Sequence, residues 1–240
     1  MTADGVVIRD LQGVAEMKAA EALQLQVWGA ADLPDNSDIL LAIQHEGGLV
    51  AGAFRGGRLL GFVFGFPTAT AGVQHSHRLA VHGDARGLGL GARMKWHQRD
   101  WCLARGIHTV RWTYDPMRAI NARLNIAALG ATAGTYLVDY YGPMEGINAG
   151  LPSDRVLAEW DLAAPGVAAR AARRPAPSPR VDLRLPIPPD LDALIAADPA
   201  AALDARLALR AAMHDAFARG LRVTGFDPAA SCYLLTAGQP

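Results

Sequence analysis

Cysteine and lysine are both scarce in this sequence. Its 240 residues include two cysteines, Cys102 and Cys232, which lie far apart and form neither a C-x-x-C motif nor a Cys/His cluster. Because zinc sites and disulfide frameworks need such groupings, we expect neither, and we expect no metal cofactor. Lysine occurs only at Lys18 and Lys95 in a chain rich in alanine and arginine, a bias that fits base composition rather than function.

Excess charge, long apolar runs and a targeting segment are also missing. The chain has 23 basic and 23 acidic side chains, so its formal net charge is zero. This balance gives no electrostatic reason to expect a nucleic acid or an anionic membrane as partner. No apolar run is long enough to span a bilayer, and residues 1–5 lack a charged-then-apolar signal pattern. We therefore expect a soluble, cytoplasmic protein with no membrane partner.

Glycine, in contrast, is concentrated in one short segment. Residues 86–92 read Arg-Gly-Leu-Gly-Leu-Gly-Ala and lie between a strand-like run, 78–82, and a helix-like run, 92–105. Glycine leaves room for a ligand to approach the backbone, and a helix start adds unpaired amides and the positive end of its dipole. The segment therefore predicts a main-chain site for a phosphate or pyrophosphate, with Arg86 adding charge at its mouth.

Three interpretations of this loop are open. The dinucleotide pattern G-x-G-x-x-G/A is matched by Gly87, Gly89 and Ala92, and the acyltransferase pattern Q/R-x-x-G-x-G/A by Arg86, Gly89 and Gly91. The third is a glycine-rich turn without a ligand. A dinucleotide loop begins directly at the end of its strand, whereas five residues, 82–86, intervene here. The P-loop pattern is absent, since no Gly-Lys-Ser/Thr follows the glycines.

The runs before the loop argue against a parallel, dinucleotide-type start. Three consecutive strand-like runs precede it, and Gly56-Gly57 between the first two is a hairpin signal. The sequence thus predicts an antiparallel meander over 49–54, 58–66 and 74–82. After the loop we expect a helix over 92–105, a strand over 109–114, a helix over 119–129, and strands over 135–140 and 155–162.

This order of elements, with the Arg86–Ala92 motif, resembles the GNAT superfamily of acyl-CoA-dependent N-acyltransferases. Shorter motifs, such as Asp115-Pro116, Asn121-Ala122, Leu129-Gly130 and Ser153-Asp154-Arg155, resemble a bacterial subgroup of acyltransferases, some associated with N-acylation of amino acids, including succinylation. The resemblance implies an α/β (α+β) fold with a mixed, mostly antiparallel central sheet, helices on both faces, and a splay near Val81 and Tyr114 that admits acyl-CoA.

The resemblance covers the first two thirds of the chain. We expect a GNAT-like core over 1–162, a Pro/Ala/Arg-rich linker over 163–180 and a C-terminal α+β extension over 181–240. The extension has strand-like runs at 181–185, 221–226 and 232–236 and helix-like runs at 191–196 and 200–219. The longer helix carries Leu203, Leu207, Leu209, Met213 and Phe217 as its expected apolar face. Sixty residues make a thin core alone, so we expect the extension to pack on the GNAT-like core.

The cofactor side of the site follows from the same resemblance. It implies acetyl-CoA, or succinyl-CoA by the subgroup likeness, as acyl donor. The main chain of Leu79 and Val81 would pair with the pantetheine arm, and Asn121 would bond it. The pyrophosphate would be held by Arg86, Gly87, Leu88, Gly89, Leu90, Gly91 and Ala92.

The catalytic groups are less clearly marked. His77, on the strand before the loop, is the leading candidate for a general base, because histidine titrates near neutrality; a strand histidine without catalytic role and deprotonation through water are the alternatives. The tyrosine that many GNAT members carry four residues before the Leu-Gly end is Ile126 here. Tyr140 and Tyr141 are candidates to donate to the leaving thiolate or to line the acceptor cleft.

Two polar residues are candidates for binding the acceptor or the acyl group. Asn125 lies one turn after Asn121, and Arg155 is a plausible bidentate partner for a carboxylate; surface exposure or pairing with Asp154 is the alternative for Arg155. The sequence thus predicts an N-acyltransferase acting on a primary amine of a small molecule, by direct attack. A catalytically silent acyl-CoA-binding sensor or interaction module is the alternative, a dinucleotide-dependent enzyme the third. A homodimer is compatible with the sequence.

Overall fold

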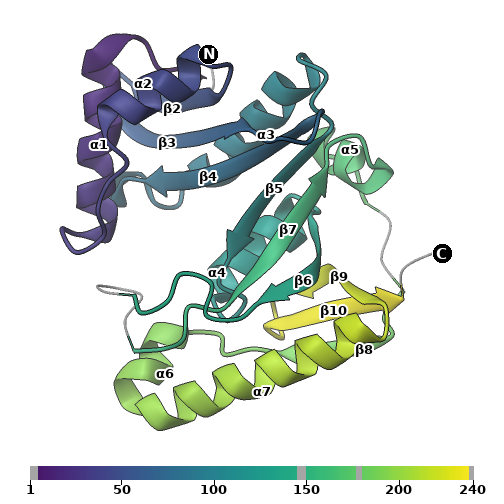
Figure 1. Ribbon diagram of the computed structural model, residues 1–240. Coiled ribbons are helices and arrows are strands. Elements are labelled where there is room, and N and C mark those ends of the chain that lie inside the picture. Colours follow the sequence, from purple (N-terminus) through teal and green to yellow (C-terminus); the bar gives the residue numbers. More distant parts are fainter. Residues whose placement is uncertain (1–4, 145–149, 177–179, 238–240) are drawn as a thin grey trace. The chain divides into compact units, whose positions relative to one another are not determined.

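A computed structural model describes residues 5–144, 150–176 and 180–237 (Figure 1). Two compact units make up the chain, a first unit of residues 1–110 and a second unit of residues 111–240. Strand β5, Thr109–Tyr114, begins just before this boundary. The C-terminal extension therefore belongs to the same unit as the strands that follow β5.

The sheet of the first unit is an antiparallel meander. Its strands follow one another in space in the order of the chain, and each is antiparallel to the next: β1 Val7–Asp10, β2 Leu49–Arg55, β3 Arg58–Pro67 and β4 Val73–Val81. Gly56 and Gly57 join β2 to β3 with φ of 54° and 83°, a pair of left-handed conformations suited to a tight hairpin. The meander predicted from the sequence is confirmed.

Helices cover both faces of this sheet. Helices α1, Gly13–Trp28, and α2, Ser37–His45, pack on one face, and α3, Leu90–Leu103, packs on the other, after the short helix η1, Gly83–Ala85. Strand β2 is buried on both sides because its alternate residues serve two cores. Val50 packs with Met17 and Phe62, while Leu49 packs with Leu90.

The second unit has a six-stranded arrangement of order β5-β7-β6-β9-β10-β8. Its other strands are β6 Thr132–Leu137, β7 Arg155–Asp161, β8 Leu183–Pro186, β9 Leu221–Asp227 and β10 Cys232–Ala237. Strand β9 is antiparallel to β6 through Ala133 and Val223, and β6 is antiparallel to β7. The extension therefore continues the sheet of the preceding strands, and the prediction that it packs on them is confirmed.

The helices of the second unit are α4 Ala119–Ala122, η2 Arg123–Ala128, α5 Pro165–Ala171, α6 Leu191–Ala197 and α7 Pro199–Ala218. Helix α7 packs against β6 and β9. Two large aromatic side chains fill the core. Trp160 donates its indole N–H to the carbonyl of Leu129 at 3.0 Å, and Tyr233 donates its hydroxyl to the carbonyl of Pro116 at 2.9 Å. Tyr233 thus ties the extension to the end of β5.

Three local expectations differ from the structure. The helix expected over 119–129 is α-helical only to Ala122 and then widens to π geometry, where the amide of Leu129 donates to Leu124, five residues back. Strand β6 ends at Leu137, because Asp139 turns the chain with φ of 45° and donates its amide to Asp154. Part of the expected linker is helix α5, which begins at Pro165, a residue suited to a first helical turn.

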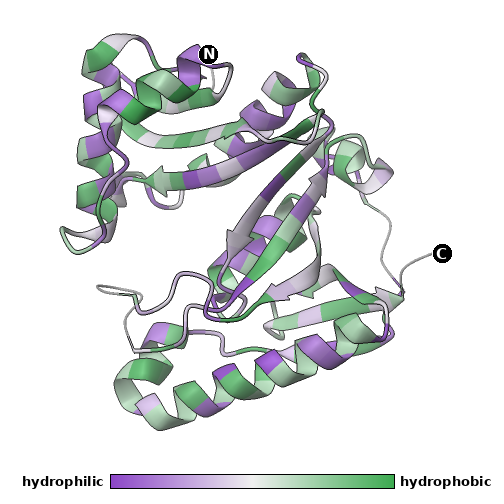
Figure 2. Ribbon diagram, viewed as in Figure 1, coloured by the Kyte–Doolittle hydropathy of each residue, from purple (hydrophilic) through white to green (hydrophobic). Residues whose placement is uncertain are grey.

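The buried face of α7 also differs from the expected one. Both hydrophobic and hydrophilic residues are spread along this helix (Figure 2). Leu203 and Leu207 are exposed, and the buried positions are Ala202, Arg206, Leu209, Met213 and Ala216. A charged residue thus occupies a core position. Within the described parts of the chain, no helix is both long and apolar enough to cross a membrane.

Candidate active site

The glycine-rich loop connects β4 to α3 in the first unit. Helix η1 follows β4, Arg86 is extended, and Gly87 and Gly89 have φ of 84° and 65°. Gly89 is the N-cap of α3 and offers no side chain to cap it. A Cβ at either glycine would meet no atom within 4 Å, so both glycines border open space rather than packed protein. The left-handed backbone accounts for glycine at these positions.

Several backbone amides of this loop have no hydrogen-bond partner among the described residues. Within residues 5–144, the N–H groups of Gly87 and Gly89 and the first three of α3, those of Leu90, Gly91 and Ala92, donate to no other group. Arg86 is exposed beside them. Converging free amides at the positive end of a helix dipole form an anion site, provided that solvent or a ligand occupies it. The geometry suits a phosphate.

His77 lies on the face of β4 that α1 and α2 cover. The strand bulges at His77, because Phe64 opposes Arg78 and the next residue, Gly65, opposes Ser76. The imidazole is 34% exposed, with Nε2 3.9 Å from Oδ1 of Asp35. Burial lowers the pKa of His77, although Asp35 opposes this shift. The ring is therefore neutral near pH 7 and able to accept a proton.

In the second unit, a buried carboxylate organises the chain ahead of β7. Asp154 accepts hydrogen bonds from the hydroxyl of Tyr136 at 2.7 Å, from two nitrogens of Arg210 at 2.8 Å each and from the amide of Asp139 at 3.0 Å. Burial opposes ionisation of Asp154, but these hydrogen bonds outweigh it and hold the pKa of the carboxyl below its usual value. Asp154 thereby fixes the backbone from which Arg155 projects.

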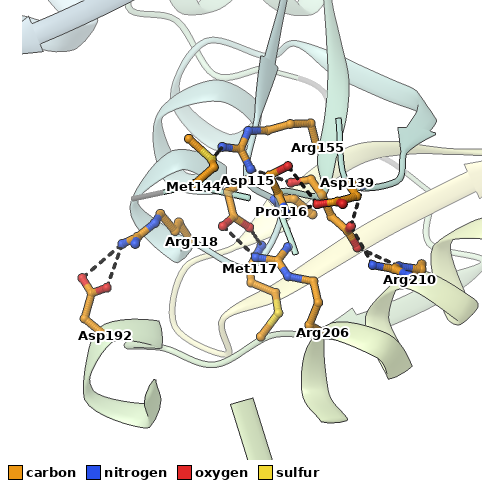
Figure 3. A network of polar contacts seen from close by, with 12 residues as sticks. Asp115, Pro116, Met117, Arg118, Asp139, Met144, Arg155, Asp192, Arg206 and Arg210 are labelled. Carbon is orange, nitrogen blue, oxygen red and sulfur yellow. Dashed lines mark hydrogen bonds and ion pairs between the residues drawn. The ribbon is translucent and has the colours of Figure 1, made fainter. Parts of the chain in front are cut away.

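Arg155 lines a cleft, and its guanidinium lies beside Met144 (Figure 3). Its Nη1 donates to the backbone carbonyl of Asp154 at 2.8 Å and its Nη2 to the sulfur of Met144 at 3.0 Å. The guanidinium also lies 5.1 Å from the ring centre of Tyr141, whose hydroxyl is 2.9 Å from Oγ1 of Thr113. Arg155 and Tyr141, both site candidates from the sequence, are thus in contact.

Two more arginines line the same cleft. Arg206 of α7 donates to Oδ2 of Asp115 at 2.7 Å, and Nη1 of Arg118 donates to both carboxylate oxygens of Asp192 at 3.0 and 3.1 Å (Figure 3). Leu151 contributes an apolar wall. The described residues contain no group of three or more His, Cys, Asp or Glu side chains that could hold a metal ion. The second unit therefore concentrates positive charge on side chains, where the first unit uses main-chain amides.

Comparison with known proteins identifies the family. Residues 16–123 match the model of the acetyltransferase (GNAT) family, a segment that includes the loop and His77. The matched segment belongs to the GNAT superfamily. No curated protein matches the sequence significantly.

Solved GNAT structures share the fold at low sequence identity. The N-acetyltransferase of Staphylococcus aureus Mu50 aligns with a TM-score of 0.54 and 16% identity, over 65% of this chain and 98% of its own. yncA of Salmonella typhimurium, a proposed acetyltransferase solved with its cofactor acetyl-CoA, aligns with a TM-score of 0.54 and 20% identity, over 73% of this chain and 99% of its own. The ribosomal-protein-alanine N-acetyltransferase of Brucella melitensis aligns with a TM-score of 0.52 and 17% identity, over 64% of this chain and 98% of its own.

The candidate residues of this GNAT protein fall into two groups. The first unit holds His77, Leu79, Val81 and the loop Arg86–Ala92. Leu79 and Val81 pack their side chains on the α3 side of the sheet, which leaves only their main chain for a cofactor role. The second unit holds Asn121, Asn125, Tyr140, Tyr141 and Arg155.

Exposure separates the candidates of the second unit. Tyr140 and Tyr141 lie beyond β6 in an exposed turn, with their rings edge to face at 4.8 Å. Asn125 is buried, whereas Asn121 is partly exposed. Ile126, at the position where many family members have tyrosine, is fully buried. Exposure thus leaves the two tyrosines accessible to a substrate.

Sequence reasoning missed the arginines and the aspartate that share the cleft with Arg155. Arg118 and Arg206 were not among the site residues predicted from the sequence, and Asp115 entered only through the motif Asp115-Pro116. Arg206 interrupts the small and apolar positions Ala202, Leu209 and Met213 of α7 at helical spacing. A charged residue in a buried stripe was the available signal, because such a residue needs a specific partner.

Proposed function

We propose that the protein transfers an acyl group from acyl-CoA to a primary amine of a small molecule. The observation that carries this proposal is the set of unpartnered amides at Gly87 and Gly89–Ala92, at the start of α3 in a GNAT fold. In our proposal these amides and Arg86 hold the pyrophosphate of coenzyme A. The main chain of Leu79 and Val81 binds the pantetheine arm, and Asn121 supports it.

The proposed reaction is direct. The neutral amine attacks the thioester carbonyl, a C–N bond forms, the C–S bond breaks, and the amine loses one proton while the thiolate of coenzyme A leaves. His77 accepts the amine proton, because its lowered pKa keeps the imidazole neutral. Tyr140 or Tyr141 donates to the leaving thiolate, and Asn125 contributes to acceptor binding. Acetyl-CoA is the proposed donor, with succinyl-CoA as the rival.

A second candidate function is a catalytically silent acyl-CoA sensor. One observation favours it: the position that often carries the tyrosine acid is occupied by the buried Ile126. A sensor would bind acyl-CoA at the same loop without releasing free thiol. The acyltransferase remains the better-supported proposal, because the leaving thiolate of coenzyme A tolerates weak assistance and two accessible tyrosines are present.

The loop is tested by Gly89→Val. The left-handed backbone disfavours a β-branched residue, and the new side chain would project into the open space where the pyrophosphate approaches. Loss of several charge-assisted hydrogen bonds should weaken acetyl-CoA binding about 1000-fold, measured by calorimetry. Free-thiol release across an amine panel then separates enzyme from sensor.

Gly106→Val is the matched control. Gly106 follows α3 at its other end, has φ of 71°, and a Cβ there would also meet no atom within 4 Å. The control carries the same backbone strain without touching the loop. If Gly89→Val and Gly106→Val bind acetyl-CoA as tightly as the parent, coenzyme A binds elsewhere and the proposed function loses its support.

A further inference from the structure

The cleft of the second unit is built from four separate parts of the chain. Asp115 and Arg118 follow β5, Arg155 opens β7, and Ile195 and Arg206 come from α6 and α7. The space between them opens to solvent, and together with the solvent at its mouth it measures about 280 Å³, so the cleft is a shallow opening rather than an enclosed cavity. All these groups belong to one unit, so the extension after residue 180 completes the cleft.

Arg206 is buried with most of its hydrogen-bonding capacity unused. Its side chain is 1% exposed, and one bond, from Nη2 to Asp115, is present. Nε and Nη1 of Arg206 are buried and have no hydrogen-bond partner in the described part of the chain. An arginine keeps its charge even when buried, so unmet N–H groups cost free energy that an anion would recover.

Arg155 is a second buried guanidinium, and within the described residues no carboxylate forms a hydrogen bond or ion pair with it. It is 8% exposed, and its two contacts are to a backbone carbonyl and the weak acceptor sulfur of Met144. Burial lowers the pKa of Arg155, Asp115 opposes that shift, and the positive charges of Arg206 and Arg118 add to it. Three positively charged guanidinium groups, those of Arg118, Arg155 and Arg206, thus lie around the same cleft.

Among the residues that the structure describes, charge pairing in the cleft is incomplete. Arg118 is matched by Asp192, which leaves Asp115 to serve both Arg155 and Arg206. The neighbouring carboxylate, Asp154, already accepts bonds from Arg210, Tyr136 and an amide. Two buried guanidinium groups facing one carboxylate leave room for one more negative charge.

Apart from Ser153, the remaining wall of the cleft is apolar. Met144, Leu151, Leu191 and Ile195 line it beside the arginines. A phosphate or sulfate has no apolar surface to bury against such a wall, whereas a carboxylic acid with a hydrocarbon body has one. The cleft therefore matches a small carboxylate whose other end is apolar.

We propose that Arg155 and Arg206 bind the carboxylate of a small, apolar-bodied carboxylic acid in this cleft. Arg206 offers Nε and Nη1, and Arg155 offers its guanidinium from the opposite chain segment. The ligand's body lies against Leu151 and Ile195. This inference rests on the proposed function in one respect: the carboxylate belongs to a substrate, either the amine acceptor, as in an amino acid, or a dicarboxylic acyl group.

Binding is tested on the full chain without coenzyme A. Calorimetry with leucine, leucinamide and succinate is the direct measurement. At least one of the two carboxylates, leucine or succinate, should bind. If the protein binds leucine more tightly than succinate, it should bind leucinamide at least about tenfold more weakly than leucine, because the amide lacks the negative charge. If neither carboxylate binds, the proposal is wrong.

Variants assign the binding to the two arginines. Arg155→Gln and Arg206→Gln should each weaken carboxylate binding about 10- to 100-fold. Arg155→Gln removes repulsion between buried cations, so its melting temperature without ligand should be unchanged or higher, a readout that a structural role would reverse. Arg219→Gln, at the end of α7 and paired with Asp215 on the surface, is the control that should bind like the parent. Equal binding by Arg155→Gln and the parent would overturn the proposal.

Turnover distinguishes the two sources of the carboxylate. With acetyl-CoA as donor, Arg155→Gln should raise KM for leucine but not for 3-methylbutylamine if the acceptor carries the carboxylate. If the acyl group carries it, the variant should raise KM for succinyl-CoA but not for acetyl-CoA. An unchanged KM in all four cases contradicts the proposal. Carboxylate binding without acyl transfer would support the proposed carboxylate site and contradict the proposed acyltransferase function. Acetyl transfer without carboxylate binding would support the acyltransferase function and contradict the carboxylate site.

Discussion

Lys95 in the first unit and Arg206 in the second are both buried cations, yet they have different surroundings. Lys95 is 3% exposed and donates to the neutral oxygens of Ser76 at 3.1 Å and Gln98 at 2.7 Å. Arg206 is 1% exposed and donates to the carboxylate of Asp115. Lys95 thus donates to neutral acceptors, whereas Arg206 donates to an anion.

The chemistry of the two side chains explains the difference. Burial lowers the pKa of Lys95 to about 7, so the amine can shed its charge and remain hydrogen-bonded. Arginine has no such option, and the pKa of Arg206 is raised because its bond to Asp115 outweighs its burial. A buried lysine is therefore compatible with a structural role, whereas a buried arginine with unmet N–H groups indicates a ligand.

Exchanging the two residue types should break this comparison most severely. Lys95→Arg places a permanent charge among Ser76, Gln98 and the buried thiol of Cys102. We expect a loss of about 3 kcal/mol or more in the free energy of unfolding, measured by urea denaturation. The reciprocal Arg206→Lys keeps a cation beside Asp115 and should cost less. A Lys95→Arg protein as stable as the parent would show that the pocket around Lys95 accepts charge.

His77 extends the comparison to a group with access to solvent. Its pKa is lowered by burial, as for Lys95, but the imidazole is partly exposed and can exchange its proton. His77→Ala should reduce turnover about 100-fold with little change in acetyl-CoA affinity, as expected for loss of a general base. The loss should narrow at high pH, where the amine is already neutral.

The pH profile gives the control for His77. Because the neutral imidazole is the active form and burial lowers the pKa of His77, kcat/KM of the parent should fall with an inflection on the acid side of about 6.5, the ordinary pKa of histidine. His77→Ala should lack this inflection. His75→Ala removes a ring 5.7 Å away on the same strand and should retain it. Equal turnover of His77→Ala and the parent near neutral pH would assign proton removal to water or a carboxylate.

The main-chain site was predictable from sequence and the arginine cleft was not. Glycine spacing between a strand and a helix directly encodes backbone geometry at Gly87 and Gly89, so a local motif was sufficient. Arg206 meets Asp115 across 91 positions of the chain, and no local pattern marks such a pair. Leu203 and Leu207 were expected to be buried on α7, but they are exposed. Which face of a helix is buried depends on partners that are distant in sequence, and a local pattern does not reveal them.

Turn chemistry accounts for the error at the end of β6. The run Thr135–Tyr140 has strong β propensity, but Asp139 adopts φ of 45° and its carboxylate accepts the amide and the hydroxyl of Ser153 at 3.0 and 3.1 Å. These bonds end the strand early. Tyr140 consequently lies in an exposed turn rather than at the end of the predicted strand. Tyr141 belongs to the same turn and lies against Arg155.

The smallest expected effect is a change in the pH dependence of stability caused by Lys95→Met. Lysine in the unfolded chain has a pKa of 10.5 and in the folded protein about 7, so between these values the unfolded state binds more protons. The free energy of unfolding should therefore rise with pH from about 7. The raised pKa of Cys102, about 12 against 9.0, acts in the opposite sense, so it cancels the rise from about pH 9 and reverses the trend only above the unfolded-state pKa of lysine, 10.5. Between pH 7 and 9 the free energy of unfolding of the parent should increase by up to about 2 kcal/mol. Lys95→Met should start from a higher value at pH 7 and show a flat profile.

Urea titrations at pH 7, 8 and 9 measure both slopes, with Lys18→Met as the control whose free energy of unfolding should rise like that of the parent. A parent whose stability does not change between pH 7 and 9 would show that Lys95 stays charged in the fold, and the contrast with Arg206 would then rest on hydrogen bonding rather than on loss of a proton.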